Sequence, residues 1–229
     1  MSSHRTSDAD QPPAGRRGIR FGWRDLAEQI EAFAQRWPEA RADRRGWHFV
    51  AAAGVARLRL PLAATRAVAD EPIAAYAARL GDDLGRQVVL LLQAGKAALG
   101  YWDGDELLRH KAFARYVVRG TGRAQPLHLR TRGKSRYGSR LRLQNWRRLL
   151  VETSERLGAW WQEFGVPERV FVAAGVRAFG DLVAVDPPPP FAARAGELER
   201  IPMHVHAPDF AELRRVRGWL LHGRLELPQ

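Results

Sequence analysis

The chain has 229 residues, of which 45% are hydrophobic and 27% are charged, as in a folded globular protein rather than a disordered or fibrous one. It contains no cysteine, which excludes disulfides, thiol catalysis and thiolate metal sites, and its longest apolar run is too short to span a bilayer. The net charge of +12 comes from one segment of the chain. Residues 107–151 hold 13 Arg and Lys and no Asp or Glu, which leaves 24 basic against 25 acidic residues elsewhere. Such a block attracts polyanions, so we expect a cytoplasmic nucleic-acid-binding protein without membrane contact.

Residues 1–18 are expected to form a disordered tail, because they hold charged side chains and two prolines but no apolar core. Residues 19–86 are expected to form an N-terminal α+β unit. Hydrophobic spacing predicts a helix over 24–37, a hairpin over 47–60 that is broken at Gly54, and a short helix over 71–80.

Residues 87–229 are expected to form the main domain, which opens with a three-strand meander. The strand predicted over residues 87–93 contains the continuous apolar run 88–92, typical of a buried central strand, and residues 96–102 follow after a turn. In the third strand, predicted over 111–119, Phe113 and Arg115 share one face at period two. A long loop is expected from about 120 to 138.

The clearest predicted helix covers residues 139–164, with Ser139 as N-cap and Gly165 as the C-terminal stop. A strand over 169–174, a strand over 199–206 and a helix from the capping Asp209 to Leu221 complete the pattern. The expected fold class is therefore α/β, with a mixed β-sheet in which the three-strand meander is followed by alternating helices and strands.

Four arginines crowd the first turns of the long predicted helix: Arg140, Arg142, Arg147 and Arg148. A helix N-terminus favours acidic side chains, so this placement breaks a local rule and points towards function. The alternative interpretation is a solvated face in which repulsion is tolerated.

Two other motifs are weaker indications of a functional site. Gly133-Lys134-Ser135 lacks the earlier glycine of a phosphate loop, because His128 stands at that position. His204 and His206 alternate in a predicted strand and could bind zinc, but only Asp209 and His222 are available as further ligands. We therefore expect no metal and no cofactor.

Several segments in the basic block resemble a known family. They are Leu108-Arg109-His110-Lys111, the run from Arg115 to Arg119, Gly122-Arg123-Ala124-Gln125, and the run from Gly133 to Ser139 before an arginine-rich helix. Together they resemble the central domain of class-one termination factors of the eukaryotic and archaeal type. They are most similar to its relatives in ribosome quality control, the Vms-type peptidyl-tRNA hydrolases. The resemblance covers about residues 87–229 and implies a release-factor central domain with a ribonuclease-H-like fold.

The resemblance implies a ribosome-rescue peptidyl-tRNA hydrolase that acts as a monomer on the large ribosomal subunit, its rRNA and peptidyl-tRNA. Gln125 would be the catalytic residue that helps water attack the peptidyl ester. The catalytic loop around it would contain Gly120, Gly122, Arg123 and Ala124. The expected RNA-binding residues are Arg119, Arg130, Arg132, Lys134, Arg136, Arg140, Arg142, Arg147 and Arg148.

Two alternatives to hydrolysis remain. The family has Gly or a small residue directly before the catalytic Gln and usually Gly before that, and here Ala124 takes the first of these positions and Arg123 the second. A non-catalytic RNA-binding factor on the same scaffold would accept this change. A ribonuclease with metal-bound carboxylates is disfavoured by the acid-free block. No codon-reading module is identifiable, which favours rescue over ordinary termination.

Overall fold

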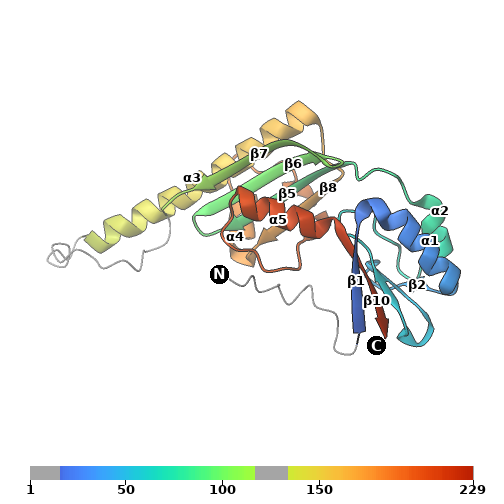
Figure 1. The fold of residues 1–229 in the computed structure, drawn as a ribbon. Helices are drawn as coiled ribbons and strands as arrows, with labels where there is room; N and C mark the ends of the chain where they lie inside the picture. The colour runs from blue at the N-terminus through green and yellow to red at the C-terminus, as the bar shows by residue number, and fades with distance from the viewer. Residues whose placement is uncertain (1–15, 117–133, 229) are drawn as a thin grey trace. The chain divides into compact units, whose positions relative to one another are not determined.

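The computed structural model of the chain describes residues 16–116 and 134–228, which form two compact units (Figure 1). The first unit contains residues 16–84 and 215–228 of these, and the second contains the described residues between 85 and 214. Each unit has a five-stranded sheet, so the chain is a mixed α/β protein, as predicted. Within the described residues, no helix combines the length and the apolar character needed to cross a bilayer.

The sheet of the first unit joins the two ends of the described chain. Its strand order is β1-β10-β4-β3-β2, with bounds Arg16–Gly22, His222–Pro228, Arg57–Arg59, His48–Val50 and Arg41–Ala42. β1 pairs with β10 along its whole length, and β10 also pairs with β4. Residues 215–228, which the sequence interpretation assigned to the main domain, therefore lie in the first unit. Residues 16–18, which we expected in the tail, lie in β1.

Two α-helices accompany this sheet, α1 (Leu26–Arg36) and α2 (Ile73–Arg79), preceded by the 3-10 turn η2 (Trp23–Asp25). A second such turn, η3 (Ala52–Gly54), joins β3 to β4. Phe49 of β3 and Tyr76 of α2 are fully buried, and their ring centroids lie 5.1 Å apart. The predicted hairpin and both predicted helices of this region are confirmed.

The sheet of the second unit has the order β7-β6-β5-β8-β9, with bounds Glu106–Ala114, Lys96–Asp103, Arg86–Gln93, Arg169–Ala174 and Glu199–Arg200. β5, β6 and β7 pair antiparallel in succession, whereas β8 runs parallel to β5. Residues 88–92 of the central β5 are at most 1% exposed, because both faces of the sheet are covered. The predicted buried central strand is confirmed.

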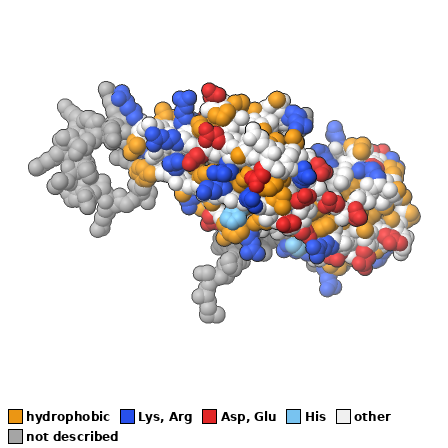
Figure 2. All heavy atoms as spheres, turned by 90° about the horizontal axis from the view of Figure 1, so that it is seen from above, with side chains coloured by type: hydrophobic (Ala, Val, Ile, Leu, Met, Phe, Trp, Pro, Cys, Tyr) orange, Lys and Arg blue, Asp and Glu red, His pale blue; other side chains and the backbone are white. Residues whose placement is uncertain are grey.

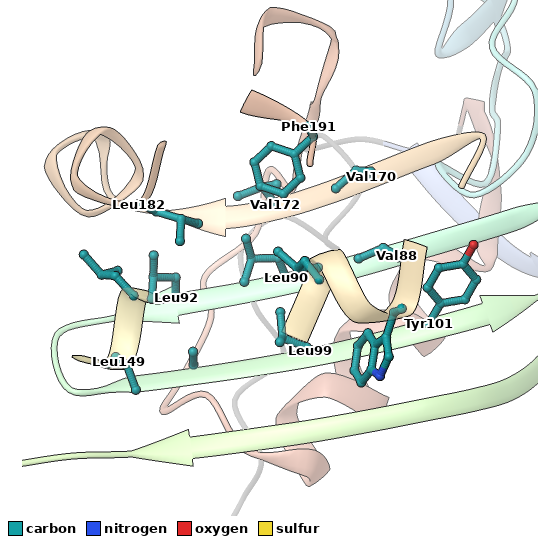
Figure 3. Close-up of a cluster of buried hydrophobic side chains, with 14 residues drawn as sticks. Val88, Leu90, Leu92, Leu99, Tyr101, Leu149, Val170, Val172, Leu182 and Phe191 are labelled. Atoms are coloured by element: carbon teal, nitrogen blue, oxygen red, sulfur yellow. The ribbon is translucent and has the colours of Figure 1, made fainter. Parts of the chain in front are cut away.

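Helices α3 (Lys134–Phe164) and α4 (Val176–Val183) lie on one face of this sheet, together with residues around η5 (Ala192–Glu197). Figure 3 shows the cluster that joins them, in which side chains of β5, β6 and β8 meet Leu149, Leu182 and Phe191. On the opposite face lies the start of α5 (Phe210–Leu220), where the Phe210 ring stacks on His110 at 3.9 Å between centroids. Asp209 caps α5 as predicted, since its Oδ1 accepts the Glu212 backbone N–H at 2.8 Å.

Several boundaries differ from the sequence-based expectations. α3 begins at Lys134, so Ser139 is inside the helix and not its N-cap. It ends at Phe164 as expected, and Gly165 follows with φ +90°. The third strand is β7, which begins five residues earlier than predicted and ends at Ala114.

The strand predicted over 199–206 is only the two-residue β9, because Pro202 has no N–H to continue the ladder. We did not predict α4 or β10. α4 has only eight residues, which are too few to show a clear helical periodicity of apolar positions. In β10, Arg224 and Glu226 are buried at positions where apolar residues would have indicated a strand.

Candidate nucleic-acid interface

The N-terminal half of α3 carries most of the described residues that we predicted to bind RNA. The helix is fixed on the sheet by its apolar stripe, in which Leu149, Leu150 and Leu157 are at most 2% exposed. Before this anchored part, Leu143 is 70% exposed and Trp146 is half-buried. The basic half of α3 is therefore positioned by the second half of the helix, whose apolar side chains pack on the sheet.

The arginines of this half lie at the protein surface. Arg140, Arg147 and Arg148 are exposed, and Arg142 is half-buried. No acid stands between residues 107 and 151, and within the described part of the chain Arg147 and Arg148 have no carboxylate partner. On the face seen in Figure 2, several Lys and Arg side chains lie at the end where α3 begins, and acidic and basic side chains are mixed over the remainder. Cations that protein carboxylates leave uncompensated bind phosphate well.

A notch of about 470 Å³, which we call the basic notch, lies beside α3 and is lined by Arg115, Gln144, Arg147, Arg148, Val151 and Glu152. Arg115 follows directly after β7, and its guanidinium donates to Oε2 of Glu152 from Nη2 at 2.6 Å and from Nε at 3.1 Å. This ion pair fixes one arginine beside two others. The notch can therefore accept an anionic group such as a backbone phosphate, with the amide of Gln144 as a further donor.

Two more contacts join α3 to β7 and to the residues directly after it. Asn145 Nδ2 donates to the backbone carbonyl of Tyr116 at 2.9 Å, and Arg109 Nη2 contacts Glu163 Oε1 at 3.0 Å. Arg109 and Arg115 lie on the same face of β7 as Phe113, which packs against the core. The shared face of Phe113 and Arg115 that the sequence predicts is thus confirmed. The chain is consequently held against α3 up to residue 116, directly before the segment that we predicted to be catalytic.

A larger groove of about 850 Å³ runs between α3 and α4, and Arg147 lines it as well as the basic notch. We call it the α3–α4 groove. Leu143, Trp146 and Leu150 of α3 line it together with Val176 and Ala178 of α4, and the turn residue Ala94 also contributes. Trp146 Nε1 donates to Asp181 Oδ2 at 2.9 Å, a contact that joins the two helices across the groove.

The predicted catalytic loop lies outside the described residues. This applies to Gln125 and to Gly120, Gly122, Arg123 and Ala124, as well as to the predicted RNA-binding residues Arg119, Arg130 and Arg132. Lys134 and Arg136 are in the first turns of α3 instead of in a loop. Among the described residues, the structure brings Arg147 and Arg148 together at the basic notch, and Arg142 and Arg147 line the α3–α4 groove.

The two histidines considered for zinc do not lie on a strand, which corrects the geometry expected from their alternation. They are in the irregular segment after β9, and their rings meet edge to face at 5.2 Å between centroids. His206 is held by Glu212, whose Oε1 accepts the His206 backbone N–H at 2.6 Å and lies 3.3 Å from His206 Nδ1. This contact ties the segment to α5.

Sequence reasoning did not assign a binding role to Arg115, Gln144 or Glu152. The only available signal was the period-two pattern that places Arg115 on the same face of its strand as Phe113. Nothing in the sequence indicates that Glu152, 37 residues later, would meet it.

A family model described as Bacteroidetes VLRF1 release factor matches residues 87–226. A solved structure titled "Vms1 mitochondrial localization core" aligns with a TM-score of 0.46 and 12% sequence identity, and the alignment covers 86% of this chain and 81% of that one. No curated protein matches the sequence. The family match confirms the relationship to release factors that the motifs of the basic block predict.

Proposed function

Because the chain belongs to the Bacteroidetes VLRF1 release factor family, we propose that it rescues stalled large ribosomal subunits by hydrolysing peptidyl-tRNA. In this reaction a water oxygen bonds to the ester carbonyl carbon of the nascent peptide. The bond from that carbon to the terminal ribose oxygen of the tRNA breaks, and the ribose oxygen leaves with a proton. We further propose that the protein acts as a monomer in the cytoplasm.

Gln125 is the proposed catalytic residue, presented by a loop that contains Gly120, Gly122, Arg123 and Ala124. An activated ester needs a positioned water and stabilisation of the developing charge on oxygen, which one amide side chain and backbone N–H groups can supply. The rRNA and the tRNA would contribute the remaining groups. No metal or other cofactor enters this scheme.

Family membership is the observation that carries the proposal. The acid-free half of α3 supports it, because its exposed Arg147 and Arg148 form a surface suited to rRNA or tRNA phosphates. The anchoring of Tyr116 by Asn145 supports it further, since it would present the following segment from a defined point. The proposed RNA-binding residues are Arg119, Arg130, Arg132, Lys134, Arg136, Arg140, Arg142, Arg147 and Arg148.

A second candidate is a non-catalytic ribosome-binding factor on the same scaffold. The dipeptide Arg123-Ala124 before Gln125 favours it, because the related enzymes usually have glycine where Arg123 stands. A side chain at that position is costly if catalysis requires a positive φ there.

The test is release of labelled peptide from peptidyl-tRNA on purified large ribosomal subunits. We expect wild-type protein to release the peptide and Gln125→Ala to lose at least a hundredfold in rate while its affinity for the subunit is unchanged. Gln162→Ala is the matched control, because this exposed amide lies at the far end of α3, away from both the basic notch and the groove.

Release by Gln125→Ala at the wild-type rate would refute the catalytic assignment. No release by either protein, with both still bound to the subunit, would instead favour the non-catalytic factor. Arg123→Gly would then show whether the arginine is the reason, since it restores the glycine of the related enzymes.

A further inference from the structure

The α3–α4 groove has a different character from the rest of the basic surface. Val176 is 81% exposed and Leu143 is 70% exposed, and these are the two most exposed large hydrophobic residues in the described part of the chain. Both line the groove, whose floor contains the half-buried Trp146. Water-exposed aliphatic side chains around one apolar hollow indicate a surface that a partner covers.

Positive charge surrounds this apolar floor. Arg142 lines it from α3, and Arg177 lines it from α4 and is exposed. The first turn of α4, from Gly175 to Ala178, also lines the groove. Its backbone N–H groups precede the first intrahelical bond, which Phe179 donates to Gly175, and the positive end of the helix dipole lies there. The groove therefore combines apolar contact area with an anion-favouring end.

Two carboxylates also line the groove, but they do not cancel this preference. Asp181 already accepts the Trp146 indole N–H at 2.9 Å, and Asp186 lies after the end of α4. With Arg147 the lining contains three arginines and two aspartates, and the cations lie on the α3 side and at the α4 N-terminus. The charge pattern fits a ligand with an anionic group next to apolar side chains.

We infer that the α3–α4 groove is a docking site for a protein segment in which Asp or Glu flanks apolar residues. RNA is the less suitable occupant, because single-stranded bases stack on exposed aromatic faces, whereas the exposed side chains here, Leu143 and Val176, are aliphatic and the Trp146 ring is half-buried. This partner is distinct from the nucleic acid proposed for the outward face of α3, although the two sites share Arg142 and Arg147. The inference does not depend on hydrolysis at Gln125.

The experiment uses the full chain and a displayed library of random dodecapeptides. Peptides selected on wild-type protein are labelled with fluorescein, and their binding is measured by anisotropy. We expect the selected sequences to carry a carboxylate beside at least two apolar residues. The double variant Leu143→Gln with Val176→Gln should bind them at least tenfold more weakly, and Arg177→Glu should also weaken them. Both leucine and valine are exposed, so folding should be unaffected, as an unchanged melting temperature would show.

Leu141→Gln is the matched control, because Leu141 is a partly exposed leucine of α3 that does not line the groove, and it should bind the peptides like wild type. A 12-nucleotide single-stranded RNA serves as the second probe, and its affinity should not change in the double variant. Three results would overturn the inference. They are no selected peptide, peptides that bind the double variant as tightly as wild type, and loss of RNA affinity in the double variant, which would make the groove part of the RNA surface.

Discussion

At the residue scale, the backbone setting decides what a side chain can do at a given position. Gly46 lies in a turn of the first unit with φ +69°, and an added Cβ would overlap the carbonyl oxygen of Ala67. The same turn is held by the bond from the Ala67 backbone N–H to the Gly46 carbonyl at 3.1 Å. Gly158 lies inside α3, and an added Cβ there would meet no atom within 4 Å. Substitution of the two glycines by alanine should therefore change the free energy of unfolding in opposite directions.

We predict that Gly46→Ala lowers the free energy of unfolding by about 2 kcal/mol or more, because alanine is strained at this φ and clashes with the backbone. Gly158→Ala should raise it by about 0.5–1 kcal/mol, because alanine has the higher helix propensity. Urea denaturation of the full chain measures both. Equal effects of the two substitutions would contradict the described backbone at Gly46.

At the scale of elements, β7 and α3 act as a joined pair. Arg109 and Arg115 from the strand side contact Glu163 and Glu152 of the helix, and Asn145 holds the carbonyl of Tyr116. The two acids that α3 uses here lie in its second half, and within the described residues Arg147 and Arg148 of the first half have no carboxylate partner. The same helix thus attaches itself to the sheet and presents positive charge.

We predict a coupling free energy of about 0.2–1 kcal/mol between Arg115 and Glu152 in a double-mutant cycle of Arg115→Gln and Glu152→Gln. The value is modest because the two side chains are 34% and 40% accessible to water, and salt should reduce the coupling further. Thermal or urea unfolding of the four proteins measures this coupling.

Glu155→Gln supplies the control for this cycle, since Glu155 is an exposed acid on the same helix. Arg115 should show no coupling to it. Equal coupling to Glu152 and Glu155 would mean that the effect comes from overall charge and not from the described ion pair.

At the scale of the whole molecule, charge is segregated along the chain. The excess of 13 basic residues lies between 107 and 151, and the remaining sequence is almost neutral. In the second unit this excess reaches the surface on α3, where the basic notch brings Arg115, Arg147 and Arg148 together. A surface of this kind binds nucleic acid mainly through release of counterions.

We predict that Arg147→Gln and Arg148→Gln each weaken binding to ribosomal RNA uniformly over sequence. Each should also reduce the slope of log affinity against log salt by about 0.7–1, which corresponds to one lost phosphate contact. Titrations at several salt concentrations measure the slope.

Arg156→Gln removes the same charge from the same helix, eight residues beyond Arg148 and outside the basic notch, so it should leave the slope almost unchanged. A loss of slope that is equal for all three substitutions would show that net charge, and not the notch, governs the affinity.

The sequence by itself determined the features that depend on neighbouring residues. Residues 88–92 are apolar without interruption, so they form a strand buried on both faces, and the stripe that includes Leu149 and Leu157 forms the long helix. The order of motifs from His110 to Ser139 was sufficient for the family relationship, because motifs are local patterns. The proposed role of Gln125 rests on that local pattern alone.

Only the tertiary structure decided which distant residues meet. β10 pairs with β1 and β4 in the first unit, although most of the segment that matches the family model lies in the second, because strand pairing depends on hydrogen bonds between remote backbones. At the basic notch, Arg115 pairs with a glutamate 37 residues away in the sequence. The α3–α4 groove lies between two helices whose contact no sequence pattern predicts. Local patterns carry no information on such contacts, since these arise when packing of the apolar faces brings the elements together.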